Sequence, residues 1–217
     1  MKDILMKKDF ELAVFDMDGV LVDVESSWVW VHDYFNVNND HSLELYLNDE
    51  IDDLEFIRRD IELWRSRNEG LTKEEIKSIL SDVPLMEGYR RCLKNIKEKK
   101  YKTAIISGGL KPLAEQIGSD YFDIIKANDV EEIEGKLSGE GILEVKLDDK
   151  GSTFDELLDE FGVKPEKCVA VGNSFIDSPM LEKAGLGIAF DPADEKVKRA
   201  ADVIIEEKNL CRVLDHL

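Results

Sequence analysis

Short apolar runs alternate with amphipathic segments along most of this chain. The first run, Leu12-Ala13-Val14-Phe15, has no polar residue and a length typical of a buried strand. From about residue 25 to residue 80 the apolar residues recur at helical spacing instead, as in the series Trp28, Val31 and Phe35. This block therefore predicts helices alone.

Beyond the helical block, the pattern becomes a regular alternation of helices and strands. In order it predicts a helix over 87–99, a strand over 101–106, a helix from 112, a strand near 122–126, a hairpin between 130 and 145, a helix over 153–161, a strand over 168–171, a helix over 176–184, a strand over 186–190, a helix near 195 and a strand over 203–205. Such alternation is typical of an α/β protein with a doubly wound parallel sheet.

The position of the helical block indicates how the chain is divided. It follows the first strand directly, and the turn-forming Asp82-Val83-Pro84 closes it. We therefore predict a catalytic core made of residues 1–22 and 83–217, with a helical cap at 23–82 inserted after the first strand. The small β-hairpin belongs to the core in this division.

The amino-acid composition limits the classes of partner that the protein is expected to bind. The 217 residues carry 48 Asp and Glu against 29 Lys and Arg, for a net charge of −19, which disfavours nucleic acid as a partner. No apolar run approaches the ~20 residues of a membrane span, so we expect no membrane partner. Cys92, Cys168 and Cys211 lie far apart in apolar segments, which favours reduced core thiols and a cytoplasmic location. The sequence carries no prediction of oligomeric state.

The first strand ends in two closely spaced carboxylates. Asp16 and Asp18 stand two residues apart, so both side chains point the same way if the extended backbone continues. Like charges this close favour a bound cation or a shared proton. The pattern indicates a magnesium site, an acid/base pair or both, although Asp-x-Asp-Gly is also ordinary turn chemistry.

Three further strand ends or helix starts carry polar groups, in a fixed order. Ser107-Gly108-Gly109 offers a hydroxyl and backbone amides to a phosphate before a helix. Lys150 precedes a helix start and offers positive charge, while Asn173 and Asp177 follow a later apolar strand and offer oxygen ligands to a metal. Each group alone is also compatible with a plain loop or a solvated side chain. Their joint occurrence in this order favours a functional site.

This order of motifs resembles the haloacid dehalogenase (HAD) superfamily of phosphohydrolases over essentially the whole chain. Residues 16–20 match its first motif, Ser107 the second, Lys150 the third and residues 172–177 the fourth. The first motif also resembles β-phosphoglucomutase-like members, but the hairpin, Lys150-Gly151 and the fourth motif are similar to the phosphoserine phosphatase branch. That branch has a helical cap after the first motif.

The resemblance implies roles for these residues. Asp16 is expected to be the nucleophile that forms a phospho-aspartate, and Asp18 the general acid and base. Ser107 and Lys150 are expected to hold phosphoryl oxygens, together with the Gly108 and Gly109 turn. Magnesium is expected on Asp16, the Asp18 carbonyl and the fourth motif, Asn173 and Asp177.

Two departures from the family pattern bear on metal and substrate. Asn173 stands where the family usually has a metal-binding Asp, so weaker magnesium binding is expected. Glu25 falls at the place of the cap Glu that holds a substrate ammonium, but Asp60 falls at the place of the cap Arg, and Arg58 is a nearby substitute. We expect hydrolysis of a small phosphorylated metabolite, O-phosphoserine first. The alternatives are another phosphorylated acid or sugar, or a pseudophosphatase that binds a ligand.

Overall fold

A seven-stranded sheet forms the centre of the structure, a computed structural model that describes residues 9–217. The strand order is β4-β3-β2-β1-β5-β6-β7, and every neighbouring pair is parallel except the antiparallel pair β3-β4. The strands are β1 (Leu12–Phe15), β2 (Lys102–Leu110), β3 (Ile124–Ile133), β4 (Lys136–Ile142), β5 (Cys168–Gly172), β6 (Leu186–Phe190) and β7 (Val203–Ile205). The predicted α/β class with a doubly wound parallel sheet and a hairpin is confirmed.

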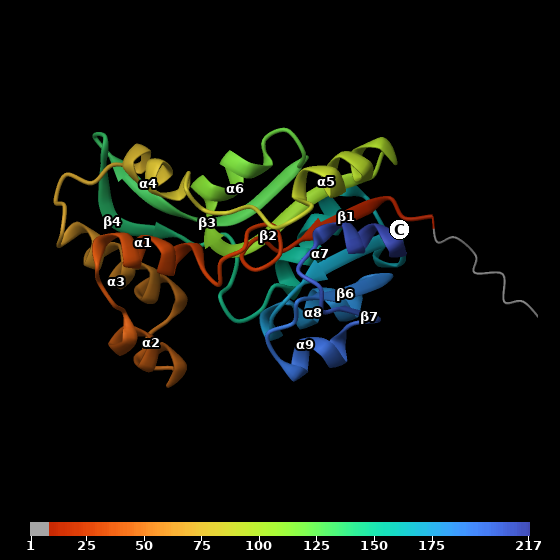
Figure 1. Ribbon diagram of the computed structural model, residues 1–217. Coiled ribbons are helices and arrows are strands. Elements are labelled where there is room, and N and C mark those ends of the chain that lie inside the picture. The colour runs from red at the N-terminus through yellow and green to blue at the C-terminus, as the bar shows by residue number, and fades with distance from the viewer. Residues whose placement is uncertain (1–8) are drawn as a thin grey trace, which may run out of the picture.

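Helices cover both faces of this sheet (Figure 1). They are α5 (Tyr89–Glu98) and α6 (Lys111–Gly118) on one face, and α7 (Gly151–Phe161), α8 (Ser178–Lys183) and α9 (Glu195–Ala200) on the other. Alternate residues of β1 serve the two layers: Ala13 and Phe15 belong to the apolar cluster that contains α5, and Leu12 and Val14 to the cluster that contains α7. This alternation follows from the two-residue repeat of a strand.

Four helices occupy the segment between β1 and α5. They are α1 (Ser27–Phe35), α2 (Asp40–Leu47), α3 (Asp53–Arg65) and α4 (Lys73–Leu80). The apolar side chains Ile57, Ile61 and Trp64 of α3 are buried in the same cluster as the α5 face of the sheet. The predicted all-helical block is confirmed, whereas its separation as a cap over 23–82 stays a prediction. Residues 1–8 of the predicted core lie outside the described residues.

The β3-β4 hairpin lies against the helical block (Figure 1). A Cβ added to Gly141 of β4 would lie 2.2 Å from Cγ2 of Ile57 in α3, so the two segments pack at their closest approach through a glycine. Lys73 at the start of α4 also pairs with Asp129 of β3 at 2.5 Å. The hairpin is thus shared between the predicted core and the predicted cap.

The structure differs from the pattern at several element ends. Strand β2 continues past residue 106 to Leu110, with a register shift toward β3 between Ser107 and Leu110. The helix expected over 176–184 is a 3₁₀ turn at Phe175–Asp177 followed by α8, and a 3₁₀ segment at Leu210–His216 was not predicted. Among residues 9–217, none of the helices combines the length and apolar character that a membrane crossing requires.

Candidate active site

The carboxyl end of β1 brings a lysine and two aspartates together in the protein interior. Lys150 Nζ lies 2.6 Å from Asp16 Oδ1 and 2.6 Å from Asp177 Oδ1. Asp16 follows β1, Lys150 is the residue before α7, and Asp177 ends the turn after β5, so three elements far apart in sequence meet here. All three residues are at most 4% exposed. The sequence-predicted strand-end cluster therefore exists.

Burial governs the charge of Asp16. Burial, followed by the nearby Asp177 carboxylate, raises the pKa of Asp16 to about 7, against the lowering effect of the Lys150 ammonium. Among the described residues, the hydrogen bonds to this side chain engage Oδ1, which accepts from the Met17 amide at 2.7 Å and faces Lys150. None of these contacts engages the second carboxylate oxygen, Oδ2.

Asp18 is held by one of its two oxygens. Its Oδ2 accepts hydrogen bonds from the Ser27 amide at 2.8 Å and the Ser27 hydroxyl at 2.9 Å. Its Oδ1 is buried and has no hydrogen-bond partner in the part of the chain that the structure describes. Burial raises the pKa of Asp18 to about 6, although the Ser27 hydrogen bonds lower it. Such a pKa suits a group that must give and take a proton near neutral pH.

The Ser107-Gly108-Gly109 turn lies beside these carboxylates. A Cβ at Gly109 would lie 2.6 Å from Asp18 Oδ2 and 2.6 Å from Ser27 Oγ, so no larger residue fits there. Ser107 is buried, and its hydroxyl accepts a hydrogen bond from the Gly109 amide at 3.0 Å. The glycines predicted to bind phosphate thus also allow the turn to approach Asp18 closely.

Asn128 of β3 joins this turn to the loop that leads to Lys150. Its amide nitrogen donates to the carbonyl oxygens of Val145 at 2.8 Å and Gly108 at 3.3 Å, and its oxygen accepts from the Glu144 and Val145 amides at 2.8 Å. The side chain is completely buried, so these partners replace water. The sequence pattern did not indicate this residue, because its only signal is an asparagine in a strand of mixed polar and apolar residues.

Asp177 organises the loop after β5. Its Oδ2 accepts from the Asn173 amide at 2.9 Å and the Ser174 amide at 3.0 Å, while Oδ1 faces Lys150. Both oxygens therefore have partners within the protein, and the predicted role of Asp177 as a metal ligand stays a prediction. The Asn173 side chain lies over Gly19, where an added Cβ would be 2.0 Å from its Nδ2. The fourth motif is thus packed directly onto the first.

The charges and oxygen atoms of this cluster fit a divalent cation. Asp16, Asp18 and Asp177 supply three carboxylates, whereas Lys150 supplies one ammonium, so a bound cation would offset the excess of negative charge. No three His, Cys, Asp or Glu side chains within residues 9–217 form a metal-binding group by themselves. A cation here would therefore need the Asn173 amide oxygen and backbone carbonyl oxygen besides carboxylates, which are ligands that Mg²⁺ accepts.

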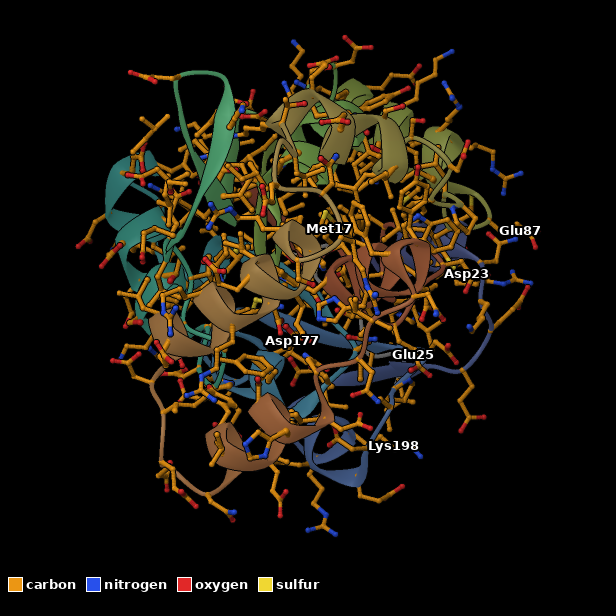
Figure 2. All side chains as sticks on the ribbon, turned by 90° about the vertical axis from the view of Figure 1, so that its left-hand side faces the viewer. Met17, Asp23, Glu25, Glu87, Asp177 and Lys198 are labelled. Atoms are coloured by element: carbon orange, nitrogen blue, oxygen red, sulfur yellow. The ribbon has the colours of Figure 1, made fainter. Side chains whose placement is uncertain are left out.

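The two side chains predicted to bind substrate, Glu25 and Arg58, lie in different surroundings. Glu25 is exposed in the segment between β1 and α1 (Figure 2). Arg58 Nε and Nη2 both donate to Glu55 at 2.7 Å on α3. Asp60, which falls at the place of the cap Arg, is buried beside His32 Nε2 at 3.3 Å. Substrate binding by Glu25 and Arg58 stays a prediction.

Comparisons with known proteins show which family this chain resembles over most of its length. A family profile described as haloacid dehalogenase-like hydrolase matches residues 10–185. A phosphoserine phosphatase of Archaeoglobus fulgidus is 32% identical over 94% of this chain, and the chain spans 58% of that relative's length. A phosphoserine phosphatase of Wolinella succinogenes is 30% identical over 95% of this chain and all of the relative.

A solved structure of a substrate-bound phosphoserine phosphatase complex is also similar. It shares 25% identity and a TM-score of 0.80, and the match covers 97% of this chain and 99% of the other. The likeness therefore extends across the sheet, its helices and the helical block between β1 and α5.

Proposed function

The chain belongs to the haloacid dehalogenase-like hydrolases, and from this premise we propose that it is a magnesium-dependent phosphomonoester hydrolase whose substrate is O-phosphoserine. The observation that carries the proposal is the buried contact of Lys150 with Asp16 beside the Ser107-Gly108-Gly109 turn. A nucleophile, a fixed positive charge and a phosphate-sized backbone turn are together what phosphoryl transfer requires.

The reaction proceeds through two displacements at phosphorus. Asp16 Oδ2 attacks the phosphoryl group while the ester oxygen leaves with a proton from Asp18, which gives an aspartyl phosphate and the free alcohol. Water then attacks the aspartyl phosphate, Asp18 takes the water proton, and inorganic phosphate leaves. Lys150, Ser107 and the Gly108 and Gly109 amides stabilise the negative charge of the phosphoryl oxygens in both steps.

Magnesium is the cofactor of this proposal. Asp16, the Asp18 carbonyl and Asn173 would hold it, and Asp177 would support the loop that carries Asn173. The ion supplies charge neutralisation between the nucleophile and the phosphoryl oxygens. The excess of carboxylates over lysine at the site supports this assignment.

The substrate class follows from the relatives and from Glu25. The similar proteins are named as phosphoserine phosphatases, and Glu25 stands two residues before Ser27, which contacts Asp18. Arg58 would have to share or release Glu55 to bind a carboxylate. Another phosphorylated acid is therefore the second candidate, since Asp60 stands where the family has its carboxylate-binding arginine.

The domain division and location are parts of the same proposal. Residues 23–82 would act as a cap over a core of 9–22 and 83–217. Three unpaired, buried cysteines support a reducing, cytoplasmic location.

A substrate screen with magnesium tests this function. Phosphoserine, its deaminated analogue and a sugar phosphate are compared in the wild-type protein, Asp16→Asn and Glu25→Gln. We expect phosphoserine to be preferred by at least 10-fold, with loss of all turnover in Asp16→Asn and loss of the preference in Glu25→Gln. Preference for the sugar phosphate would reject phosphoserine, and full activity of Asp16→Asn would reject the aspartyl phosphate.

A further inference from the structure

Ser27 makes three hydrogen bonds that join two parts of the candidate active site. Its amide and hydroxyl both donate to Asp18 Oδ2, at 2.8 and 2.9 Å, and its hydroxyl accepts from the Leu110 amide at 2.9 Å. Ser27 is completely buried. One side chain therefore connects the carboxylate of the first motif to the end of the phosphate turn.

The hydroxyl of Ser27 has no role in starting helix α1. That role belongs to Ser26, whose side chain accepts from the Val29 amide as the N-cap. Ser26 thus caps the helix, whereas the adjacent Ser27 contacts the candidate active site. Helix capping therefore does not account for the buried hydroxyl of Ser27. This hydroxyl bonds Asp18 and Leu110 instead.

Trp28 fixes the other side of the same turn. Its indole Nε1 donates to the Gly108 carbonyl at 3.0 Å. Its ring stacks on Trp64 of α3, with centroids 5.3 Å apart and planes at 21°, and its own carbonyl lies 2.6 Å from His32 Nδ1. The orientation of the indole is therefore set by the helical block and not by the turn that it holds.

We propose that Ser27 and Trp28 are positioning residues that align Asp18 with the phosphate turn, and that Ser27 thereby sets how well the enzyme hydrolyses esters with poor leaving groups. This inference rests on the proposed phosphatase function. Ser27 engages Oδ2 of Asp18 with two donors, so the buried Oδ1 is the oxygen that carries the proton toward the leaving group. The Leu110 amide holds the Ser27 hydroxyl in place, and Ser27 in turn fixes Asp18 relative to the end of β2.

Leaving-group dependence distinguishes the two residues. Protonation matters for the alkoxide of phosphoserine and little for 4-nitrophenolate, which leaves without a proton. We expect Ser27→Ala to lower kcat/KM, which reports the first displacement, by about 10- to 100-fold on phosphoserine and by less than about 3-fold on 4-nitrophenyl phosphate, because general acid catalysis contributes about 10²- to 10⁴-fold. Trp28→Phe should lower kcat/KM equally on both esters, since it loosens the phosphate turn and leaves Asp18 in place.

Ser26→Ala is the matched control. It removes the neighbouring hydroxyl and should leave the ratio of the two rates unchanged. Equal losses on both esters in Ser27→Ala, or no loss, would overturn the proposal. A measurement without substrate separates it from the proposed function: hydrogen exchange of the Leu110 amide should accelerate in Ser27→Ala and not in Ser26→Ala. An unchanged Leu110 rate rejects the positioning contact, whereas a wild-type protein without activity on either ester rejects the phosphatase function.

Discussion

The Lys150 ammonium lies 2.6 Å from the Asp16 carboxylate, and both side chains are almost completely buried. A second contact of the same length joins Lys150 to Asp177. An intact buried ion pair contributes little to the net stability of the fold, because the cost of desolvation offsets the attraction between the charges. Removal of one partner is costly, because the other charge is left buried and alone.

The first prediction concerns Lys150→Met. We expect the free energy of unfolding at pH 8 to fall by about 3 to 5 kcal/mol, the usual cost of breaking a buried pair from one side. Urea denaturation in the presence of a chelator measures it. Lys183→Met is the control, because Lys183 makes a 2.6 Å pair with Asp155 on the surface, where an ion pair contributes about 0 to 1 kcal/mol. If the free energy of unfolding fell equally in the two variants, the buried pair would contribute no more to stability than the surface pair.

The second prediction concerns the pH dependence of stability of the metal-free protein. Burial raises the pKa of Asp16 from its ordinary 3.8 to about 7, so the folded state holds this proton more tightly than the unfolded state. The resulting stability is fully present below about pH 4 and is lost as the pH rises through 7. At pH 8 the folded state carries the cost of a buried, ionised carboxylate.

Asp16→Asn should therefore be more stable than the wild type at pH 8, by about 1 to 3 kcal/mol, since each pKa unit corresponds to about 1.4 kcal/mol and loss of the Lys150 contact offsets part of the gain. Its stability should also vary less between pH 4 and pH 7. Urea denaturation across this range tests both statements, with Asp155→Asn as the exposed control. A variant that is less stable than the wild type at pH 8 would contradict the sign.

The fold was predictable because its signals are local. The apolar run at 12–15 and the alternation after residue 87 follow from side-chain periodicity, and both correspond to elements of the structure. The extension of β2 through Gly108 and Gly109 was not predictable, since two glycines normally end a strand. Pairing with β3 resumes at Leu110, which lies opposite Asn128, after a register shift that leaves both glycines between Ser107 and Leu110. Tertiary hydrogen bonding overrides local preference there.

The charged residues of the candidate site and the segment Ser107-Gly108-Gly109 were predictable from the sequence. Asp16, Lys150 and Asp177 follow apolar strands or precede a helix, and strand order brings such positions to one edge of the sheet. Ser27 and Asn128 were missed because a serine at a helix start and an asparagine in a strand are ordinary residues. Their importance lies in partners 83 and 17 residues away in the chain, which no local pattern contains.

Trp28 illustrates the limit of reading burial from sequence. Its helical spacing indicates cap core, and the structure does bury it against Trp64. Its indole N–H reaches the Gly108 carbonyl as well, so one side chain serves packing and the site together. A tryptophan often packs in an apolar core and also donates a hydrogen bond through its N–H. The helical spacing of apolar residues indicates only the packing.

The third prediction concerns Asn128→Leu, which keeps the approximate volume and removes every hydrogen bond of the side chain. The Glu144 and Val145 amides would lose their acceptor, so we expect the free energy of unfolding to fall by about 2 to 6 kcal/mol, from about 1 to 3 for each unsatisfied group. Asn95→Leu on the surface of α5 is the control, with an expected change within about 0.5 kcal/mol. A loss no larger than that of the control would show that water reaches the Asn128 site.

The last prediction concerns Asn173, which stands in the loop held by Asp177 and lies over Gly19. An amide oxygen binds Mg²⁺ without adding formal charge. A unit charge pair at ~4 Å is worth about 4 kcal/mol at an effective dielectric of ~20, and desolvation with the retained amide dipole offsets much of it. Asn173→Asp should therefore bind magnesium more tightly by roughly 1 to 3 kcal/mol, about 5- to 150-fold.

A magnesium titration of activity measures this change as the half-saturating concentration, in the wild type and in Asn173→Asp. Asn95→Asp adds the same charge on the surface of α5 and should leave the value unchanged, which separates a ligand effect from the general attraction of a more acidic protein. Because Asp177 has both oxygens engaged by Lys150 and the loop amides, it has little capacity to replace a missing ligand directly. An unchanged half-saturating concentration in Asn173→Asp would remove Asn173 from the metal site and leave Asp16 with the backbone as its core.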